Sequence, residues 1–491
     1  MKKILLKNAR VVSADGIDEK DIVISGGKIL KVCESGEGED LLANIVDEKN
    51  EITVAADREE GSGEQSFGLS GLAGADLGGG GKGLMGHSLR SCLIIDCSAD
   101  DTYVLPGLID AHVHFREPGL TQKGDFASES RAALAGGITT IFDMPNTVPP
   151  TTTYEAFKEK VRIAEEKCLC NFKLFIGIGR LKGGDFDLSE IEKVAKDKKL
   201  GKFLAGVKVY MGCSTGCMEG GESGLEKILA EKSLKKIPVV VHAEDQNCLN
   251  ENEGKFDPAD AASHGDARPQ ECAVEGVKIA CHLAKKYDRP IHIAHVTSRA
   301  ELEVIKKFKD EKVTCEVSPR HLFLSDEMYG QFGHLLKVNP PVRSREIVGD
   351  LWNAVYDGEV DIFASDHSPH TLEEKGVGAA DSGTLRFAPC LPSGMPEVQT
   401  MLSLLLNEVA HGKFGLKDIA RMCCENPARI FGLEKVGCVA DGFRADLVIV
   451  DLGEKHEITR ESLLYKCGWS CYEGRVLKGA VKRVVLGGEI I

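Results

Sequence analysis

The sequence lacks features that mark three common classes of protein. Positive charge is not in excess, because 61 Lys and Arg residues stand against 76 Asp and Glu and give a formal net charge of -15. A partner held through a general attraction to the nucleic-acid backbone is therefore not expected. No apolar run approaches the ~18 residues that cross a bilayer, and the first one ends at Leu6, too early for a signal peptide. We expect a cytoplasmic protein with neither a nucleic-acid nor a membrane partner.

Cysteine pairs of the kind that bind structural zinc are also missing. The chain has 17 cysteines, but none is arranged as CxxC, and spacings such as Cys168-x-Cys170 and Cys213-x3-Cys217 match no structural zinc pattern. A chain of 491 residues does not need a disulfide framework to fold. We therefore expect reduced thiols.

What is present is the composition of a large globular protein. With 42% hydrophobic and 28% charged residues, the chain can bury a sizeable core. At about 150 residues per domain, its length allows three domains or one large α/β barrel with attachments. Fourteen acidic and four basic residues lie between Glu34 and Asp100, so this one segment carries -10 of the net charge of -15.

The acidic segment is followed by a glycine-rich one. Eleven glycines lie in residues 61–90, and such a run cannot bury enough apolar surface to offset its backbone entropy. We predict a mobile insertion over residues 34–92. Strand patterns over residues 1–33, 93–102 and 433–491 predict one small β-domain built from both ends of the chain.

Between these ends, extended apolar runs alternate with amphipathic stretches. Eight β-then-α units predict an α/β fold, a TIM-type (β/α)8 barrel over residues 103–432. Such barrels place their active sites at the C-terminal ends of their strands. The eight apolar runs are YVLPGLIDAHVHF, TTIFDMPN, NFKLFIGIG, LAGVKVYMG, IPVVVHAED, PIHIAHVTS, KVTCEVSPRH and VDIFASDHSPH.

Four of these runs end in residues that can bind a metal. His112 and His114 are two apart on the first run, so both side chains face the same side. His242, His295 and Asp366 end three other runs. Because these positions meet at one face of a barrel, they predict a metal site.

Two further polar residues lie within the apolar runs. His292 is three residues before His295 and faces the other way, so we expect it to have a packing role. Lys208 lies in the fourth run, where a charged amine is costly to bury. Either its amine reaches a carboxylate, or it has reacted with carbon dioxide to give a carbamate whose two oxygens bridge two metal ions.

The motifs at the strand ends resemble those of a known enzyme family. The string PGLIDAHVHFREPGLTQKGDFASESRAALAGGITTIFDMPNTVPPT, followed in order by GVKVY, VHAED, IAHVTS, VNPP and ASDHSPHTLEEK, resembles the dihydroorotases of the amidohydrolase superfamily. The likeness covers residues 1–33 and about 93–491. It implies the reversible cyclisation of N-carbamoyl-L-aspartate to L-dihydroorotate plus water, in de novo pyrimidine (UMP) biosynthesis, by a homo-oligomer. It also makes the carbamate the expected state of Lys208.

The resemblance implies roles for individual residues. One zinc ion would be held by His112, His114 and Asp366, the other by His242 and His295, with Lys208 as N6-carboxylysine bridging them. Asp366 would also carry the proton. The small anionic substrate would be contacted by Arg116, Asn146, Asn339 and His370.

The residues themselves support these substrate roles unequally. Arg116 beside the metal-binding pair is suited to a bidentate grip on a carboxylate. Asn146 and Asn339 are each next to a proline, so a turn-forming role is an equally good interpretation of them. For His370 the assignment depends mainly on the resemblance.

The sequence departs from the family pattern at two places. Arg320 stands in SPRHL where relatives commonly have His, and we expect it to lie away from the ligands and not to affect the chemistry. The segment RFAPCLPSGMPEVQTML is looser than the usual run after the eighth strand. We expect it to line the substrate pocket.

Other functions stay open at this point. An allantoinase or a dihydropyrimidinase would use the same metal cage, but Arg116 calls for an anionic substrate, and MPNT is closer to the dihydroorotases. A non-catalytic scaffolding relative would be expected to have lost ligands, yet all six are present. The insertion is either an inert surface loop or an acidic docking segment for a pathway partner, such as aspartate carbamoyltransferase.

Overall fold

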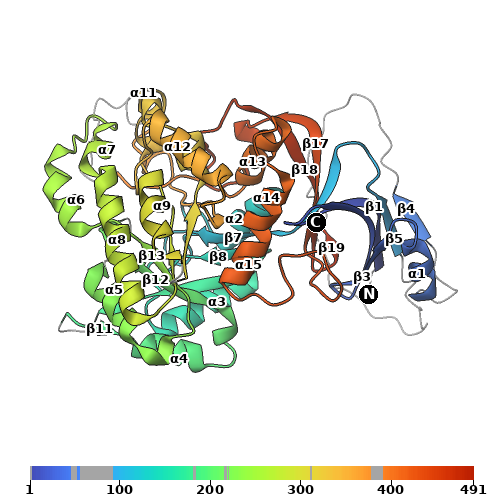
Figure 1. Cartoon of the computed structure of the whole chain (residues 1–491), viewed down its shortest axis with the longest axis horizontal. Coiled ribbons are helices and arrows are strands. Elements are labelled where there is room, and N and C mark those ends of the chain that lie inside the picture. The colour runs from blue at the N-terminus through green and yellow to red at the C-terminus, as the bar shows by residue number, and fades with distance from the viewer. Residues whose placement is uncertain are drawn as a thin grey trace, which may run out of the picture.

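The chain forms a barrel of parallel strands with a second sheet at one end (Figure 1). This computed structural model describes residues 3–45, 52–55, 92–180, 184–214, 218, 220–309, 312–377 and 391–491. The barrel sheet has eight strands in the order β16-β15-β14-β13-β12-β9-β8-β7. A parallel bridge between Val113 and His367 links the first strand to the segment after the last. The predicted (β/α)8 barrel is confirmed.

The apolar runs form barrel strands because both of their faces are covered. Every residue of β7, β8 and β13 is buried, so no alternation of polar and apolar residues is needed. The barrel strands are β7 (Leu108–Val113), β8 (Ile138–Asp143), β9 (Asn171–Gly177), β12 (Leu204–Tyr210), β13 (Val239–His242), β14 (Ile291–Ile293), β15 (Val313–Val317) and β16 (Ile362–Phe363). A separate two-stranded sheet joins β10 (Gly179–Arg180) to β11 (Phe186–Asp187).

The amphipathic stretches form helices around the barrel. In α8 (Gln270–Tyr287), Val277, Ala280 and Ala284 are buried three or four residues apart, as one apolar face requires. Asp125 accepts a hydrogen bond from the third backbone N–H of the helix that follows it. None of the helices in the described ranges is long and apolar enough to cross a bilayer. The other helices are α2 (Phe126–Ala135), α3 (Tyr154–Lys167), α4 (Ser189–Lys196), α5 (Gly221–Ala230), α6 (Gln246–Asn252), α7 (Ser263–Ala267), α9 (Arg299–Lys306), α10 (Pro319–Phe323), α11 (Tyr329–Phe332), α12 (Arg345–Tyr356), α13 (Met401–Ala410), α14 (Leu416–Ala420) and α15 (Asn426–Ile430).

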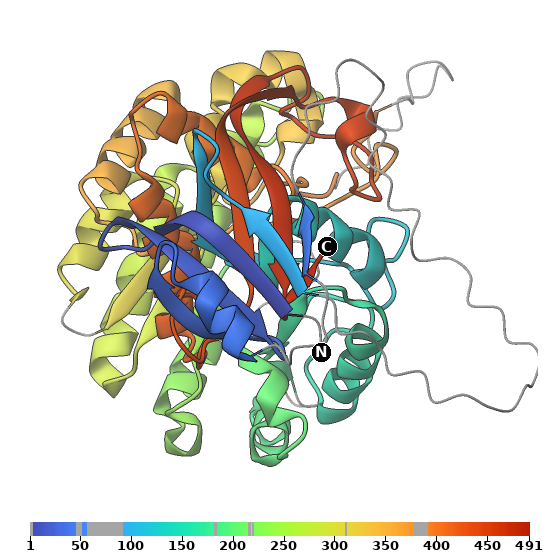
Figure 2. The same ribbon diagram turned by 90° about the vertical axis from the view of Figure 1, so that its right-hand side faces the viewer.

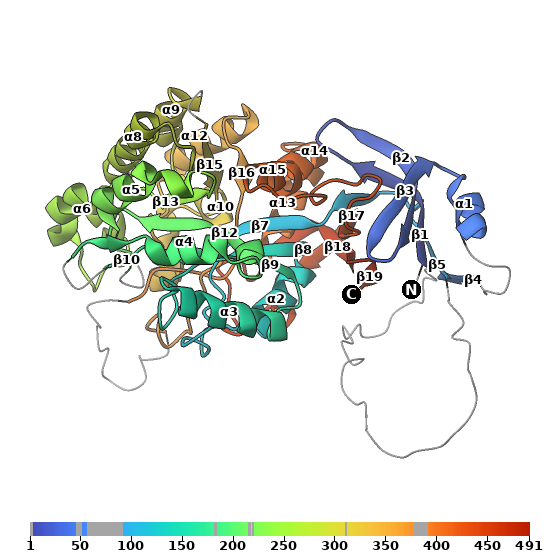
Figure 3. The same cartoon turned by 90° about the horizontal axis from the view of Figure 1, so that it is seen from below.

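Both ends of the chain meet in a nine-stranded sheet beside the barrel (Figures 2 and 3). Seven strands follow the order β19-β18-β17-β6-β1-β2-β3, and β5 pairs with both β1 and β4. Leu6, Ile24, Leu447 and Val485 contribute to its apolar core. The predicted composite β-domain is confirmed. Its strands are β1 (Lys3–Val12), β2 (Ile17–Ser25), β3 (Lys28–Glu34), β4 (Ile52–Ala55), β5 (Cys92–Asp96), β6 (Thr102–Pro106), β17 (Leu447–Glu457), β18 (Val476–Leu486) and β19 (Glu489–Ile490).

The first predicted barrel strand is in fact two strands in two different sheets. β6 pairs with β17 in the β-domain, and the barrel begins with β7. Gly107 separates them, and a Cβ built there would lie 2.2 Å from the Thr139 hydroxyl oxygen. Only glycine fits so close an approach. The predicted boundary at residue 103 therefore falls inside a strand of the β-domain sheet.

The first residues of the predicted mobile insertion contain a helix. Helix α1 (Gly38–Ile45) packs Leu42 into a cluster with Leu5 and Val23. Asp21 accepts hydrogen bonds from the backbone N–H groups of residues 36 and 38, which fixes the start of this helix. The acidic stretch therefore contains enough apolar surface to dock on the sheet. Residues 46–51 and 56–91, which make up most of the predicted insertion, lie outside the described residues.

Candidate metal centre

The six predicted metal ligands lie at the C-terminal ends of barrel strands, and all are buried. Backbone conformation is unusual here, because His295, Asp366 and Arg116 have φ values of 36°, 46° and 70°. Such conformations are uncommon outside glycine and tend to occur at functional sites. By strand, the six are His112 and His114 on or just after β7, Lys208 on β12, His242 at the end of β13, His295 after β14 and Asp366 after β16.

Three of these residues form a compact cluster. Asp366 Oδ1 lies 3.1 Å from His114 Nε2 and 3.4 Å from His112 Nε2. Their ligand atoms all lie within 4.8 Å of one another, the spacing a single metal ion needs. Burial lowers the pKa of His114 to about 3, so its ring is neutral and can donate a lone pair to a metal.

The other two histidines form a second pair next to this cluster. His242 Nδ1 lies 3.0 Å from His295 Nε2. The rings of His295 and His112 are 5.4 Å apart between centroids, which places the pair beside the three-residue cluster. Burial lowers the pKa of both His242 and His295, so both rings are available as neutral ligands.

Glu316, which the sequence analysis did not predict as a site residue, contacts the rings of two histidines. It contacts His112 Nδ1, which leaves His112 Nε2 directed toward Asp366. Its second oxygen lies 3.1 Å from His292 Nε2, so His292 does more than the packing expected of it. Carboxylates in this position orient metal-binding histidines. The one charged residue of the buried strand β15 is the signal that could have identified Glu316.

Glu244 was also missed and has the same role for the second pair. It lies 2.8 Å from His242 Nε2, and Arg268 donates to both of its oxygens. Burial alone would raise the pKa of Glu244, but Arg268 and His242 hold it well below its usual range. Its position two residues after a predicted ligand is the sequence signal for this role.

The Lys208 amine has no hydrogen-bond partner within the described ranges, although the side chain is fully buried. Burial lowers its pKa from 10.5 to about 8. A free amine of this kind is the form that reacts with carbon dioxide, and an orphaned polar atom among the ligands fits a bridging carbamate. The alternative expectation, an ion pair with a carboxylate, is not present in the described part of the chain.

Five of the six predicted ligands, all except Lys208, line one cavity. Three of the four predicted substrate residues also line it: Arg116, Asn146 and Asn339. Arg116 is anchored by donating from Nε to the Pro369 carbonyl oxygen at 3.0 Å. Burial lowers its pKa to about 10, so it stays a cation at neutral pH. The cavity is lined by His112, His114, Arg116, Asn146, Tyr210, Ser214, His242, His295, Arg320, Asn339, Asp366, Ser368, Ser393 and Gly394. Ser393 and Gly394 belong to the segment expected to line the pocket.

Two of the predicted substrate residues contact other site residues directly. Asn146 Oδ1 lies 2.5 Å from His114 Nδ1, so it orients that ring as well as facing the cavity. His370 is not among the lining residues, because it lies behind Arg116 with its Nε2 3.1 Å from Arg116 Nη2. The sequence predicts that His370 lies on the loop after the last barrel strand. It does not show whether His370 faces the cavity or contacts Arg116 from behind.

The expectation that Arg320 lies away from the ligands is wrong. Its Nη1 is 3.3 Å from Asp366 Oδ2, and its Nη2 donates to the Asp366 carbonyl oxygen at 2.5 Å. Glu397 accepts from its Nε at 2.5 Å and neutralises the buried cation. Burial alone would raise the pKa of Asp366, but Arg320 and the two neighbouring histidines hold it well below its usual range.

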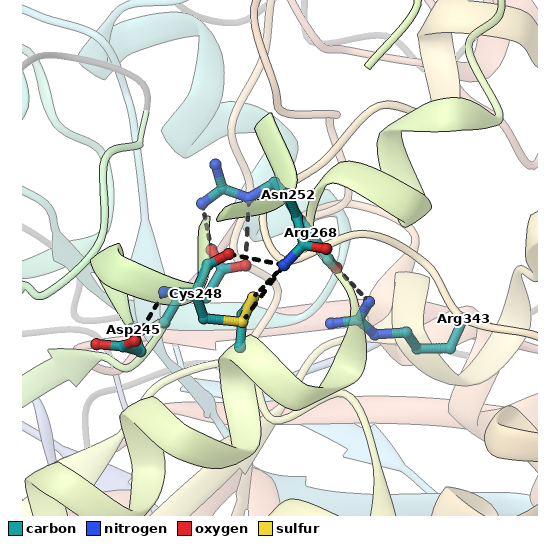
Figure 4. The surroundings of a disulfide bond; sticks show 7 residues. Asp245, Cys248, Asn252, Arg268 and Arg343 are labelled. Carbon is teal, nitrogen blue, oxygen red and sulfur yellow. Dashed lines mark hydrogen bonds and ion pairs between the residues drawn. A yellow bond between two sulfur atoms is a disulfide. The ribbon is translucent and has the colours of Figure 1, made fainter. Parts of the chain in front are cut away.

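The expectation of reduced thiols is wrong for one pair of cysteines. Cys248 on α6 and Cys272 on α8 form a disulfide (Figure 4). Asn252 Nδ2 lies 3.8 and 4.0 Å from the two sulfur atoms. The chain between the cysteines includes Arg268, the partner of Glu244, so the crosslink closes a loop that supports the second histidine pair. No motif marks two cysteines 24 residues apart on different helices.

A barrel with buried histidines, an aspartate and a lysine at its strand ends defines the class of metal-dependent hydrolases built on this fold. Residues 103–491 match the model of the Amidohydrolase family. The chain belongs to this family and, within it, to the group of the dihydroorotases.

Individual relatives support this placement. The chain is 35% identical over 394 residues to the dihydroorotase of Methanothermobacter thermautotrophicus, covering 79% of this chain and 84% of that protein. It is 36% identical over 399 residues to the dihydroorotase of Halobacterium salinarum, covering 80% and 87%. It is also 35% identical to a region of the multifunctional protein CAD of Squalus acanthias, covering 79% of this chain and 15% of that protein.

Solved structures with the same fold include a hydantoinase and a dihydropyrimidinase. The L-hydantoinase of Arthrobacter aurescens superposes with a TM-score of 0.80 at 26% identity, covering 100% of this chain and 96% of that chain. The dihydropyrimidinase of Brevibacillus agri superposes with a TM-score of 0.78 at 22% identity, covering 100% and 95%, which supports the fold alone.

Proposed function

We propose that this protein is a dihydroorotase, which interconverts N-carbamoyl-L-aspartate and L-dihydroorotate plus water in pyrimidine biosynthesis. The observation that carries the proposal is a single cavity lined by five of the six predicted metal ligands and by the buried cation Arg116. A metal centre suits amide hydrolysis and its reversal, and a buried guanidinium suits the substrate carboxylate. The similarity to dihydroorotases over most of the chain supports the same substrate.

Two zinc ions fit the donor set. His112, His114 and Asp366 would hold one, His242 and His295 the other, and carbamylated Lys208 would bridge them; the orphaned Lys208 amine and the neutral imidazoles support this assignment. When bound, the metal pair supplies a hydroxide near neutral pH, because metal binding lowers the pKa of water from ~15.7 toward ~7.

The protein's own side chains bind the substrate and move its proton. Arg116 would grip the carboxylate, with Asn146 and Asn339 on the cavity wall and His370 supporting Arg116 from behind. In the hydrolytic direction Asp366 would accept the proton of the attacking hydroxide and deliver it to the departing ring nitrogen. In the biosynthetic direction the same transfer runs backward and water leaves.

A cyclic ureide amidase is the second candidate, because the superposition on the L-hydantoinase spans the whole chain. The same metal centre would serve that reaction. Arg116 separates the two, since a dihydropyrimidine without a carboxylate would leave this buried cation unpaired in the cavity. A non-catalytic scaffolding role would give no reason to retain six buried ligands.

Three cyclic amides decide between these functions. Purified protein, supplied with zinc and bicarbonate, is assayed for hydrolysis of dihydroorotate, allantoin and dihydrouracil, with zinc content measured on the same sample. Turnover of dihydroorotate alone, with about two zinc ions bound per chain, is expected. Turnover of dihydrouracil or allantoin in its place would refute the substrate assignment, and the absence of zinc and of all turnover would favour the scaffolding role.

A further inference from the structure

Tyr210 is a cavity residue that has no role in the function proposed above. It ends β12, two residues after Lys208, so the two side chains lie on the same face of the strand. Its ring centroid is 5.3 Å from Lys208 Nζ and 5.9 Å from the centroid of the His242 ring. The side chain lines the cavity together with Arg116 and Asp366, although only 6% of its surface is exposed.

The Tyr210 hydroxyl is unsatisfied. It has no hydrogen-bond partner within the described part of the chain, whereas nearly all buried polar groups in proteins have one. Two other buried tyrosines follow the rule: the Tyr472 hydroxyl donates to Glu397 at 2.5 Å, and the Tyr465 hydroxyl accepts from the Gln399 backbone N–H at 3.0 Å. A hydroxyl left without a partner on a cavity wall is one that a ligand can satisfy.

A tyrosine side chain carries a phenolic O–H group, which is a hydrogen-bond donor at neutral pH. A neutral donor in a buried site bonds most strongly to an oxygen that carries negative charge, such as a carboxylate or the oxygen of an attacked carbonyl.

We infer that the Tyr210 hydroxyl donates a hydrogen bond to a negatively charged oxygen of the bound substrate and is thus a further catalytic residue. The inference rests on the proposed function, because it needs an anionic cyclic amide in this cavity. The group that satisfies the hydroxyl would then arrive with the substrate.

The test is Tyr210→Phe, which removes the hydroxyl and nothing else. We expect kcat/KM for dihydroorotate to fall on the order of 10–100-fold, as for other lost hydrogen bonds to charged groups. The midpoint of thermal unfolding and the zinc content should not fall, because the hydroxyl has no partner to lose in the free protein. A rise in KM would assign the hydrogen bond to the substrate carboxylate. A fall in kcat would assign it to the oxygen of the attacked carbonyl.

Tyr329→Phe is the matched control. The Tyr329 hydroxyl is equally buried and also has no partner in the described ranges, but Tyr329 does not line the cavity. We expect this variant to keep kcat/KM within about twofold of wild type, because the lost hydroxyl lies away from the cavity. The inference is overturned if Tyr210→Phe also stays within that range, if both variants lose activity equally, or if Tyr210→Phe loses its zinc.

The proposed function is judged separately, by what the wild type hydrolyses. If the wild type turns over allantoin or dihydrouracil and not dihydroorotate, the substrate assignment fails. The comparison of Tyr210→Phe with wild type is then made on the accepted substrate, where the same fall supports the donor role. If the wild type hydrolyses none of the three, both the function and this inference are refuted.

Discussion

Replacing Lys208 with methionine should stabilise the metal-free protein while abolishing its activity. In the metal-free state the buried amine has a pKa of about 8, against 10.5 for an exposed lysine. At ~1.4 kcal/mol per pKa unit, keeping this group in the folded protein costs about 3 kcal/mol at neutral pH. Methionine has a similar length and no charge, so the cost disappears. The same variant removes the bridging group proposed for the metal pair.

The pH dependence follows from the sign of the shift. The folded-state pKa lies below the unfolded-state value, so the unfolded chain binds the proton more tightly and the cost is complete below about pH 8. It shrinks as the pH rises toward 10.5. Between pH 7 and pH 9.5, the stability gap between Lys208→Met and wild type should therefore narrow to roughly half or less.

The assay is urea unfolding of chelator-treated protein, without bicarbonate, at these two pH values, together with zinc content and dihydroorotate hydrolysis after reloading. Lys160→Met is the matched control, because Lys160 is equally buried but paired with Asp143 at 2.6 Å. Removing that amine leaves Asp143 as an unpaired buried charge, and about 3–5 kcal/mol of stability should be lost. A metal-free Lys208→Met less stable than wild type, or one that binds two zinc ions and turns over substrate, would refute the reasoning.

Four other outcomes are expected. Arg116→Lys should raise KM for dihydroorotate on the order of 10–100-fold through loss of the bidentate grip; an unchanged KM in steady-state assays would contradict its role. Glu316→Gln should weaken zinc binding ~10–100-fold, measured by equilibrium dialysis, because His112 loses its orienting carboxylate; equal affinity would show that the contact is incidental. Cys272→Ser should lower the free energy of unfolding by about 3 kcal/mol, and a reductant should bring the wild type to the same value; identical urea curves with and without reductant would contradict the crosslink. Ring closure consumes one proton, so the equilibrium ratio of dihydroorotate to carbamoyl-aspartate should fall ~tenfold for each unit by which the pH rises. A ratio that is the same in mildly acidic and alkaline buffer would exclude this substrate pair.

The barrel and the position of the predicted ligands at its strand ends could be predicted from the sequence because each signal is local. A strand covered on both faces is a continuous apolar run, and a ligand such as His242 stands at the end of its run. The chain ends could be assigned to one β-domain by the same strand patterns. The boundary between β6 and β7 at Gly107 could not be predicted in this way. It depends on the close approach of Thr139, which is distant in the sequence.

The surroundings of the ligands could not be predicted in the same way. Arg320 contacts Asp366 across 46 residues of chain, and its position follows from Glu397, which is farther away still. The pairing of Cys248 with Cys272 depends on how two helices cross. These contacts are made between elements, so they exist only once the barrel has closed.

The pairing of β6 with β17 also has a consequence for synthesis of the protein. All eight strands of the barrel have been made once residue 363 has been added, before the last strands of the β-domain sheet are translated. β6 has no partner on its β17 side until residues 447–457 emerge. Until then the nascent chain presents an open strand edge, which is a template for pairing with another chain. Pairing with β17 therefore covers this edge of β6 and protects it from pairing with another chain.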